Sequence, residues 1–266
     1  MISDLEDYEG NMMADQTQIA NFFVNHYQKK FEFQAANDAG QLLKVIPKVI
    51  NDEDQKNLDV IPEAEEIKNV VFEMDPKSAP GPDGFSGIFY RSCWDIIEHD
   101  LVADVQFCWR RRFIPRGMNS SFLVLLLKTQ GAKYSNHFRP TGLSNVVFKI
   151  FTKVITKRMN VLMDKLISPS HVAYIKGRSI HELVLLASEL VNEMKVKKRG
   201  GNVGIKLDIS QAYDSVSWDF LIKVLLKYGF SASWCEWLLI LFKSARIYVM
   251  VNGGPCGFFS VERGLR

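Results

Sequence analysis

The sequence has few cysteines, and they are widely spaced. The four are Cys93, Cys108, Cys235 and Cys256, and no two of them form a CxxC pair. Disulfide-stabilised domains are much richer in cysteine, and cysteine-based metal sites and redox motifs use close pairs. We therefore expect free thiols in a reducing compartment and no disulfide-linked partner.

Long apolar runs are also missing. The longest, residues 122–127 and 237–242, have six residues each, whereas a membrane-spanning helix needs about 20. The acidic N-terminus, MISDLEDYEG, has no apolar signal core. We therefore expect a soluble intracellular protein of the cytoplasm or nucleus, with no membrane partner.

Motifs of several common enzyme classes are absent from the sequence. The five histidines form no HExxH pair, and no GxSxG, Walker A or GxGxxG pattern occurs. The net charge of only +3 excludes a strongly basic molecule, so a nucleic-acid surface would need local clustering of the 33 lysines and arginines. With 47% hydrophobic and 24% charged residues, the composition is that of an ordinary globular protein.

Apolar periodicity predicts an α+β fold that is rich in helices. Asp15, Ser144 and Ser179 are expected to cap helices, the last through a capping box with Glu182. The first 14 residues are expected to be a loose acidic end, residues 34–62 a linker, and residues 78–84 (SAPGPDG) a fixed turn. Helices are expected at 15–33, 65–74, 144–166, 179–198, 218–228 and 231–244, with two more within 85–112; strands are expected at 121–128 and 203–210, and a hairpin at 247–261.

Asp208 is the first candidate for chemistry. Residues 203–210 alternate strictly, so Asp208 is expected near a strand end, on the face opposite the apolar one. A carboxylate held on a strand suits a metal ligand in phosphoryl transfer. By pattern alone, a surface or capping aspartate is the commoner interpretation, and both remain open at this point.

Residues 206–218, KLDISQAYDSVSW, resemble the first catalytic motif of reverse transcriptases, in the form seen in non-LTR (LINE-like) retrotransposons. Four further blocks resemble the same family in the same order: the 78–84 turn, residues 138–149, residues 173–180 (AYIKGRSI) and residues 263–266 (RGLR). The resemblance covers about residues 70–266 and is loose over 15–69. It implies an N-terminal helical extension and linker at 1–69, followed by a partial reverse transcriptase domain at 70–266.

The resemblance implies roles for five residues of a nucleotide site. Asp208 would bind catalytic Mg²⁺ ions, and the Ile209 carbonyl would add a ligand. Tyr213 would close under the sugar and exclude a 2′-hydroxyl; alternatively it is a core aromatic. Lys128 and Arg139 would hold the incoming triphosphate, where leaving charge develops; alternatively they are solvated surface charges.

Nucleic-acid contacts are implied for four further residues. Arg178 would touch the template or primer backbone, and Lys149, Lys153 and Lys157 would neutralise phosphates from one helix face. A solvated helix face is the alternative for these lysines. Asp214 is expected to cap the next helix and not to act as a second metal ligand.

The implied fold is a truncated right-hand polymerase, with fingers, the first part of a palm and a small incomplete antiparallel sheet. The implied reaction is RNA-directed DNA synthesis, in which a DNA primer on an RNA template attacks a deoxynucleoside triphosphate with the help of Mg²⁺. The second metal motif of the family, an aromatic-x-Asp-Asp hairpin, does not occur in these 266 residues. We therefore predict that they are inactive alone, because a two-metal mechanism needs carboxylates on both ions.

Two alternatives to this function remain. The chain could be a non-catalytic RNA-binding remnant, or a degenerate retroelement product without a stable fold. For the second, we expect unburied apolar surface near Phe258 and Phe259.

Overall fold

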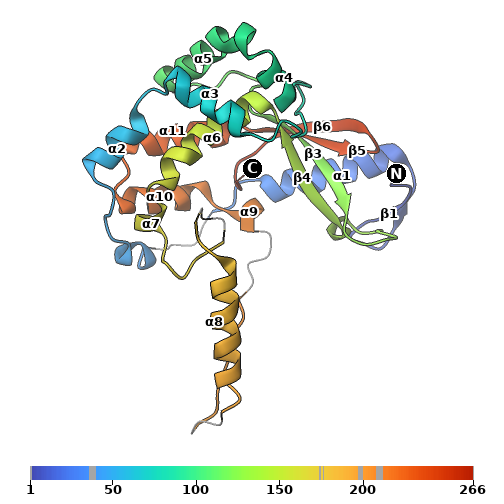
Figure 1. Cartoon of the computed structure of the whole chain (residues 1–266). Coiled ribbons are helices and arrows are strands. Elements are labelled where there is room, and N and C mark those ends of the chain that lie inside the picture. The colour runs from blue at the N-terminus through green and yellow to red at the C-terminus, as the bar shows by residue number, and fades with distance from the viewer. Residues whose placement is uncertain are drawn as a thin grey trace.

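The computed structural model describes residues 2–35, 40–173, 175, 177–196, 200–207 and 212–265, without the side chains of Ala212 and Tyr213. A four-stranded sheet lies beside a group of helices, so the predicted α+β class is confirmed (Figure 1). Among the described residues, no helix is both long and apolar enough to span a membrane.

The larger sheet has the strand order β4-β3-β5-β6. Its two hairpins are antiparallel, but β3 and β5 run parallel. The predicted antiparallel sheet is therefore wrong, and the sheet is mixed. The physical reason is the long connection from β4 to β5, which is mostly helical and lets the chain re-enter the sheet beside β3, in the same direction as β3. The strands are β3 (Ser120–Leu127), β4 (Phe138–Ser144), β5 (Arg246–Val251) and β6 (Gly254–Ser260).

The hairpin of β5 and β6 confirms the prediction for residues 247–261. Its turn residues, Asn252 and Gly253, have φ values of 50° and 88°. Two successive positive φ values are what a tight hairpin turn requires, and Asn-Gly is the pair that adopts them most readily. Phe258 is 54% exposed, as predicted, but Phe259 is only 5% exposed because it faces the core.

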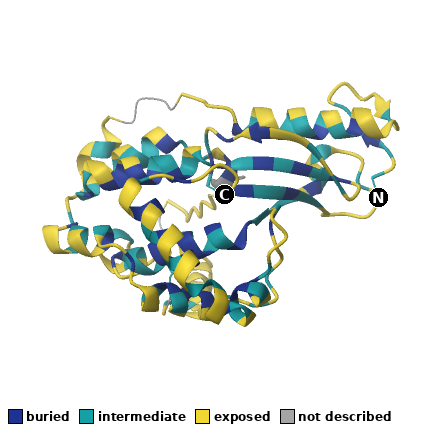
Figure 2. Cartoon of the chain, turned by 90° about the horizontal axis from the view of Figure 1, so that it is seen from above, coloured by how far each residue is buried: buried dark blue, intermediate teal, exposed yellow. Residues whose placement is uncertain are grey.

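Helix α1 (Gln16–Phe31) covers one face of this sheet (Figure 1). Asp15 caps it by accepting a hydrogen bond from the Gln18 amide, as predicted. Phe23 meets Phe138 of β4 edge to face at 5.3 Å between ring centroids. Buried residues line the strands (Figure 2), and the apolar cluster between helix and sheet includes Ile19, Phe23, Tyr27, Phe31, Leu123, Ile247, Val249 and Phe259.

The N-terminal residues are not the loose end that was predicted. Strands β1 (Leu5–Glu6) and β2 (Met12–Met13) form a small antiparallel sheet. Leu5 is fully buried, and the Glu6 amide donates to the Lys133 carbonyl at 2.7 Å. A buried apolar side chain and a backbone hydrogen bond therefore attach this segment to the loop between β3 and β4.

A second apolar cluster lies among the helices, which are grouped beside the sheet in Figure 1. It includes α2, which falls inside the predicted linker; there Asn51 forms a capping box and Leu58 is buried. The predicted long helix 144–166 is divided into α6 and α7, and its N-cap residue is Asn145 instead of Ser144. The helical elements of this part are η1 (Leu42–Val45), α2 (Asp52–Asp59), α3 (Ala64–Glu73), α4 (Gly87–Ser92), α5 (Trp94–Arg111), α6 (Val146–Asn160), α7 (Met163–Leu166), α10 (Trp218–Tyr228) and α11 (Ala232–Lys243). The short helix η2 (Ser135–His137) lies in the loop between β3 and β4.

The predicted division at 69/70 passes through α3. Residues before and after it share both apolar clusters: Leu58 packs with the later helices, and Phe23 packs with the sheet. The two predicted parts therefore share their cores within the described residues.

Helix α8 (Ile180–Glu193) extends away from the other elements (Figure 1), and its residues are exposed. Ser179 is its N-cap, but the predicted capping box is wrong, because the Ser179 side chain makes no capping hydrogen bond. Residues 203–207 of the predicted strand have no regular secondary structure, and residues 208–210 lie outside the described part. A strand needs a neighbouring backbone as partner, and residues 200–207 have none among the described residues.

Candidate functional site

The β3–β4 hairpin brings Lys128 and Arg139 together. Lys128 follows β3 directly, and its amide donates to the His137 carbonyl at 2.9 Å. Arg139 lies opposite Leu126 in the register of the two strands. The Lys128 ammonium donates to the Asn136 carbonyl at 2.7 Å, whereas Arg139 is exposed, without an ion pair or side-chain hydrogen bond to any described residue. The two cations therefore share one end of one hairpin.

The sheet face that carries Arg139 is the one turned away from α1. Directly opposed residues of neighbouring strands share a face of the sheet, so Arg139 lies on the same face as Leu126. Val124, two residues before Leu126 in β3, lies on this face as well. Further rings lie on this face: Phe122 meets Tyr248 at 6.2 Å, and Tyr248 meets Phe258 at 4.9 Å between centroids. This face is thus aromatic and partly open, with a cation near one edge.

The 78–84 turn docks on the start of α6, so two of the sequence blocks form one unit. Gly81 lies so close to Asn145 that a Cβ atom there would come within 3.0 Å of its backbone nitrogen. The buried Asn145 side chain accepts from the Asp83 amide at 3.1 Å and donates to the Gly117 carbonyl at 2.9 Å. Asn145 therefore joins the turn to the loop before β3.

The predicted lysine face of α6 is partly used inside the protein. The Lys149 ammonium donates to the Ala79 carbonyl at 2.9 Å and to Ser78 Oγ at 3.2 Å. Burial lowers the pKa of Lys149 from its ordinary value. Lys157 forms a 2.7 Å ion pair with Glu73. Lys153 is exposed and has no such partner among the described residues.

Arg178 is also occupied by contacts within the chain. Its guanidinium donates to the carbonyls of Ser168 and His171, each at 2.6 Å, and to the Asp164 carboxylate at 2.8 Å. Its side chain is 14% exposed. Arg178 therefore holds the loop after α7, and the nucleic-acid role predicted for it stays a prediction.

Of the central motif, the structure describes only the end. Asp208 and Ile209 lie outside the described residues, as does the side chain of Tyr213. Asp214 lies in the short helix α9 (Ala212–Ser215), and its carboxylate forms a 2.7 Å ion pair with Lys30 of α1. The expectation that Asp214 caps α10 is wrong, because Ser217 is the N-cap and accepts from the Phe220 amide.

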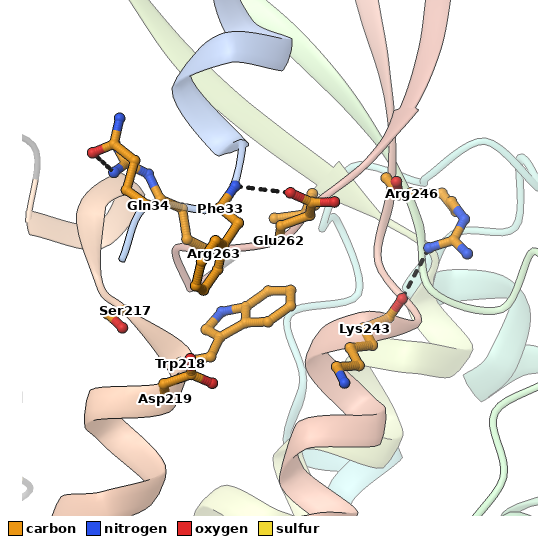
Figure 3. Close-up of a pocket in the computed structure, with 11 residues that line it drawn as sticks. Phe33, Gln34, Ser217, Trp218, Asp219, Lys243, Arg246, Glu262 and Arg263 are labelled. Carbon is orange, nitrogen blue, oxygen red and sulfur yellow. Dashed lines mark hydrogen bonds between the residues drawn. The ribbon is translucent and has the colours of Figure 1, made fainter. Parts of the chain in front are cut away.

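A cavity of about 470 Å³ lies beside this motif, between the end of α1, the start of α10 and the ends of α11 and β6 (Figure 3). Trp218 lies in its wall, and the indole donates to the Gly264 carbonyl at 2.6 Å. Cations and anions both line it, namely Lys243, Arg246, Arg263, Asp219 and Glu262.

No group of three or more metal-ligating side chains occurs in the part of the chain that the structure describes. The predicted metal ligands, Asp208 and the Ile209 carbonyl, are oxygen donors, which suits Mg²⁺. One carboxylate and one carbonyl are a partial ligand set.

Lys30 and Asn145 are two residues whose contacts the sequence interpretation missed. Lys30 stands in the last turn of a helix, where a lysine ordinarily faces solvent. Asn145 was missed because the sequence prediction places the cap at Ser144, just before it. Its contact with Gly81 could not be inferred, because the two residues are far apart in the sequence. The signal for Asn145 was the pair of glycines and prolines in the turn, which indicates a close backbone approach.

The comparisons with known proteins agree with the sequence blocks. The family model described as "Reverse transcriptase (RNA-dependent DNA polymerase)" matches residues 127–266. A protein of Xenopus laevis described as "Transposon TX1 uncharacterized 149 kDa protein" is 24% identical over 219 residues, which are 82% of this chain and 17% of that protein. The "Retrovirus-related Pol polyprotein from type-1 retrotransposable element R2" of Nasonia vitripennis is 23% identical over 202 residues, 76% of this chain and 19% of that protein. The chain thus spans less than a fifth of the length of these two curated relatives.

Proposed function

Because this chain belongs to the reverse transcriptase (RNA-dependent DNA polymerase) family, we propose that it forms part of the RNA-directed DNA polymerase of a non-LTR retrotransposon. The similarity to proteins of transposon TX1 and of retrotransposable element R2 supports this proposal. In it, residues 70–266 are the fingers and first part of the palm, and residues 1–69 are an extension packed on them.

The observation that carries the proposal is the placement of Lys128 and Arg139 at the same end of the β3–β4 hairpin. Phosphoryl transfer places growing negative charge on the leaving pyrophosphate, and fixed cations stabilise it. We assign both residues to the incoming triphosphate. The Arg139 guanidinium is exposed and can form two parallel hydrogen bonds with phosphate oxygens.

The open sheet face beside Arg139 suits a nucleobase. Phe122, Tyr248 and Phe258 form a row of ring contacts across β3, β5 and β6. Aromatic rings stack on bases with little regard to their sequence, as a polymerase requires. We therefore propose that this face receives a base of the template or of the incoming nucleotide.

Asp208, Ile209 and Tyr213 complete the proposed site. Asp208 and the Ile209 carbonyl would hold Mg²⁺, which lowers the cost of charge on the reacting oxygens when it is bound. Tyr213 would pack under the sugar and exclude a 2′-hydroxyl. These roles rest on the sequence motif.

Among the cations predicted to contact nucleic acid, we favour Lys153. Its ammonium is exposed, whereas Lys149, Lys157 and Arg178 already bind groups within the chain. We propose that these three shape the surface on which Lys153 meets phosphates. An RNA-binding remnant that depends on all three lysines is less well supported, because two of them are engaged.

Nucleotide binding tests the triphosphate assignment directly. We expect Arg139→Ala to weaken binding of a fluorescent deoxyadenosine triphosphate by about tenfold or more, because a charge-assisted pair of hydrogen bonds is lost. Arg116→Ala is the matched control, since Arg116 is also exposed and lies outside the proposed site. Equal affinities for the two variants would refute the assignment.

Primer extension tests the activity of residues 1–266 alone. We expect no synthesis on a DNA-primed RNA template, because one carboxylate does not serve two metal ions. Synthesis that disappears in Asp208→Asn would overturn this expectation and would show that a second carboxylate is supplied from elsewhere in these residues.

A further inference from the structure

The ion pair between Lys30 and Asp214 links the N-terminal helix to the catalytic-type motif. Lys30 Nζ lies 2.7 Å from Asp214 Oδ2, and the two side chains are only 13% and 9% exposed. Charges removed from water are stable only when they are paired, and breaking such a pair leaves an uncompensated buried charge. The pair therefore fixes the position of α9 relative to the last turn of α1.

A third segment, residues 262–264, binds both sides of this junction. Toward α1, Arg263 Nε donates to the Lys30 carbonyl at 2.8 Å, and the Glu262 amide donates to the Phe31 carbonyl at 3.0 Å. Figure 3 shows two more links to this end of α1, from the Phe33 amide to Glu262 at 2.8 Å and from Arg263 to Gln34.

Toward the motif, the same segment binds the residues that follow Asp214. The Gly264 amide donates to the Val216 carbonyl at 2.9 Å, and the Trp218 indole donates to the Gly264 carbonyl at 2.6 Å. One backbone hydrogen bond and the Trp218 indole thus hold residues 216–218 on one side, while the ion pair holds α9 on the other. We call Lys30, Asp214 and residues 262–264 the clasp.

We propose that Lys30 is a positioning residue, which acts through Asp214 to fix α9 (Ala212–Ser215), the short helix that follows the Asp208 motif in the sequence. Asp208 is six positions before Asp214 in the sequence, and Tyr213 is its neighbour. The family match begins only at residue 127, so this inference extends the site to a helix outside it. The expected effect of Lys30 on nucleotide binding rests on the proposed function, whereas its effect on the position of α9 does not.

The structural part is tested by hydrogen–deuterium exchange on the full chain. We expect Lys30→Met to speed exchange in peptides covering residues 212–218 by about tenfold or more, because the buried ion pair that links α9 to α1 is lost. Peptides of α5, which belongs to the other apolar cluster, should be unchanged. Lys29→Met is the matched control, since Lys29 is exposed in the same turn of α1, and Lys30→Arg should keep the protection.

Equal exchange of residues 212–218 in Lys30→Met and Lys29→Met would overturn the inference. Should Lys30→Met fail to fold, Lys30→Met combined with Asp214→Leu removes both charges and is expected to fold. Its α9 peptides would still have to exchange faster than those of the wild-type chain; full protection in this variant would also overturn the inference.

The functional part is read from sugar discrimination. We expect Lys30→Met to lower the ratio of dUTP to UTP affinity severalfold relative to Lys29→Met, because α9, the helix that contains Tyr213, is no longer held by the ion pair. A loss of folded protein alone would weaken both affinities equally and leave this ratio unchanged, which would count against positioning. If the wild-type chain binds neither nucleotide, the proposed function fails, and the exchange experiment still decides whether Lys30 fixes α9.

Discussion

Gly81 offers the sharpest test of how the sequence blocks are joined. A Cβ atom at this position would lie less than 3.0 Å from the backbone nitrogen and side-chain oxygen of Asn145 and from the Ser144 carbonyl carbon. Two of these atoms are backbone, so they do not move aside as a flexible side chain does. Gly81→Ala must therefore push the 78–84 turn away from the start of α6.

The cost can be worked from the contacts that are lost. Forcing a methyl group into a packed site costs about 1–3 kcal/mol, and losing the hydrogen bond from the Asp83 amide to Asn145 Oδ1 costs about 1 kcal/mol more. The total is about 2–4 kcal/mol. Gly84→Ala is the control: Gly84 has φ +77° but no neighbour within 4 Å of a Cβ, so only backbone strain of about 1 kcal/mol is expected.

Urea unfolding followed by circular dichroism measures both variants. With a slope of about 3 kcal/mol per molar urea, Gly81→Ala should lower the midpoint by about 1 M, clearly more than Gly84→Ala. Equal midpoints for the two variants would refute the docking of the turn on Asn145. A wild-type chain without a cooperative transition would instead support the alternative of a degenerate product.

Three further predictions concern single side chains. Ser217→Ala should destabilise the protein by about 1 kcal/mol in the same urea assay, since it removes the N-cap of α10; an unchanged midpoint would contradict the cap. Burial, with a smaller contribution from Lys30, lowers the pKa of His26 below its ordinary 6.5. The unfolded chain therefore binds the proton more readily, and the free energy of unfolding should fall as the pH drops below about 6.5. His26→Gln should flatten this pH dependence, and an identical pH profile in the variant would contradict the lowered pKa. Burial raises the pKa of the Cys108 and Cys235 thiols to about 11, so both should react with a disulfide reagent at pH 8 only after denaturation, and rapid labelling of the native protein would contradict their burial.

Much of the fold was predictable because local signals and tertiary packing agree. Asp15 caps α1, the Asn252-Gly253 pair turns the β5–β6 hairpin, and Gly229 ends α10 with φ +104°. In each case one short-range preference of a residue type decides the local backbone. The neighbours along the chain contain all the necessary information.

The errors come from places where distant residues decide. Residues 203–207 have the alternation of a strand but no adjacent strand among the described residues, and periodicity says nothing about partners. Leu58 lies in a polar stretch whose helix is stabilised by later helices. Asp214 is of a residue type that often caps helices, and only the fold shows that it forms an ion pair with Lys30, far earlier in the chain.

The candidate site follows the same rule. The β3–β4 hairpin places Lys128 and Arg139 at one end. However, β4 was not among the predicted strands, because Pro140 and Gly142 interrupt its apolar pattern. The roles of both cations stay predictions from the sequence blocks. The engagement of Lys149 and Arg178 depends on loops that pack against them from elsewhere, so their exposure could not be judged from a helix face or a turn.

The clasp has a consequence for how the chain folds. It joins residues 30, 214 and 264, and contacts so distant in sequence form slowly because a long loop must close first. On a ribosome that adds about 5–20 residues per second, α1 would wait roughly 10–50 s for its partners. Until β5 and β6 have been made, its apolar side, with Phe23 and Phe31, has at most the β3–β4 hairpin and no clasp to cover it. We therefore expect nascent chains of this protein to depend on chaperones until the last strands have emerged.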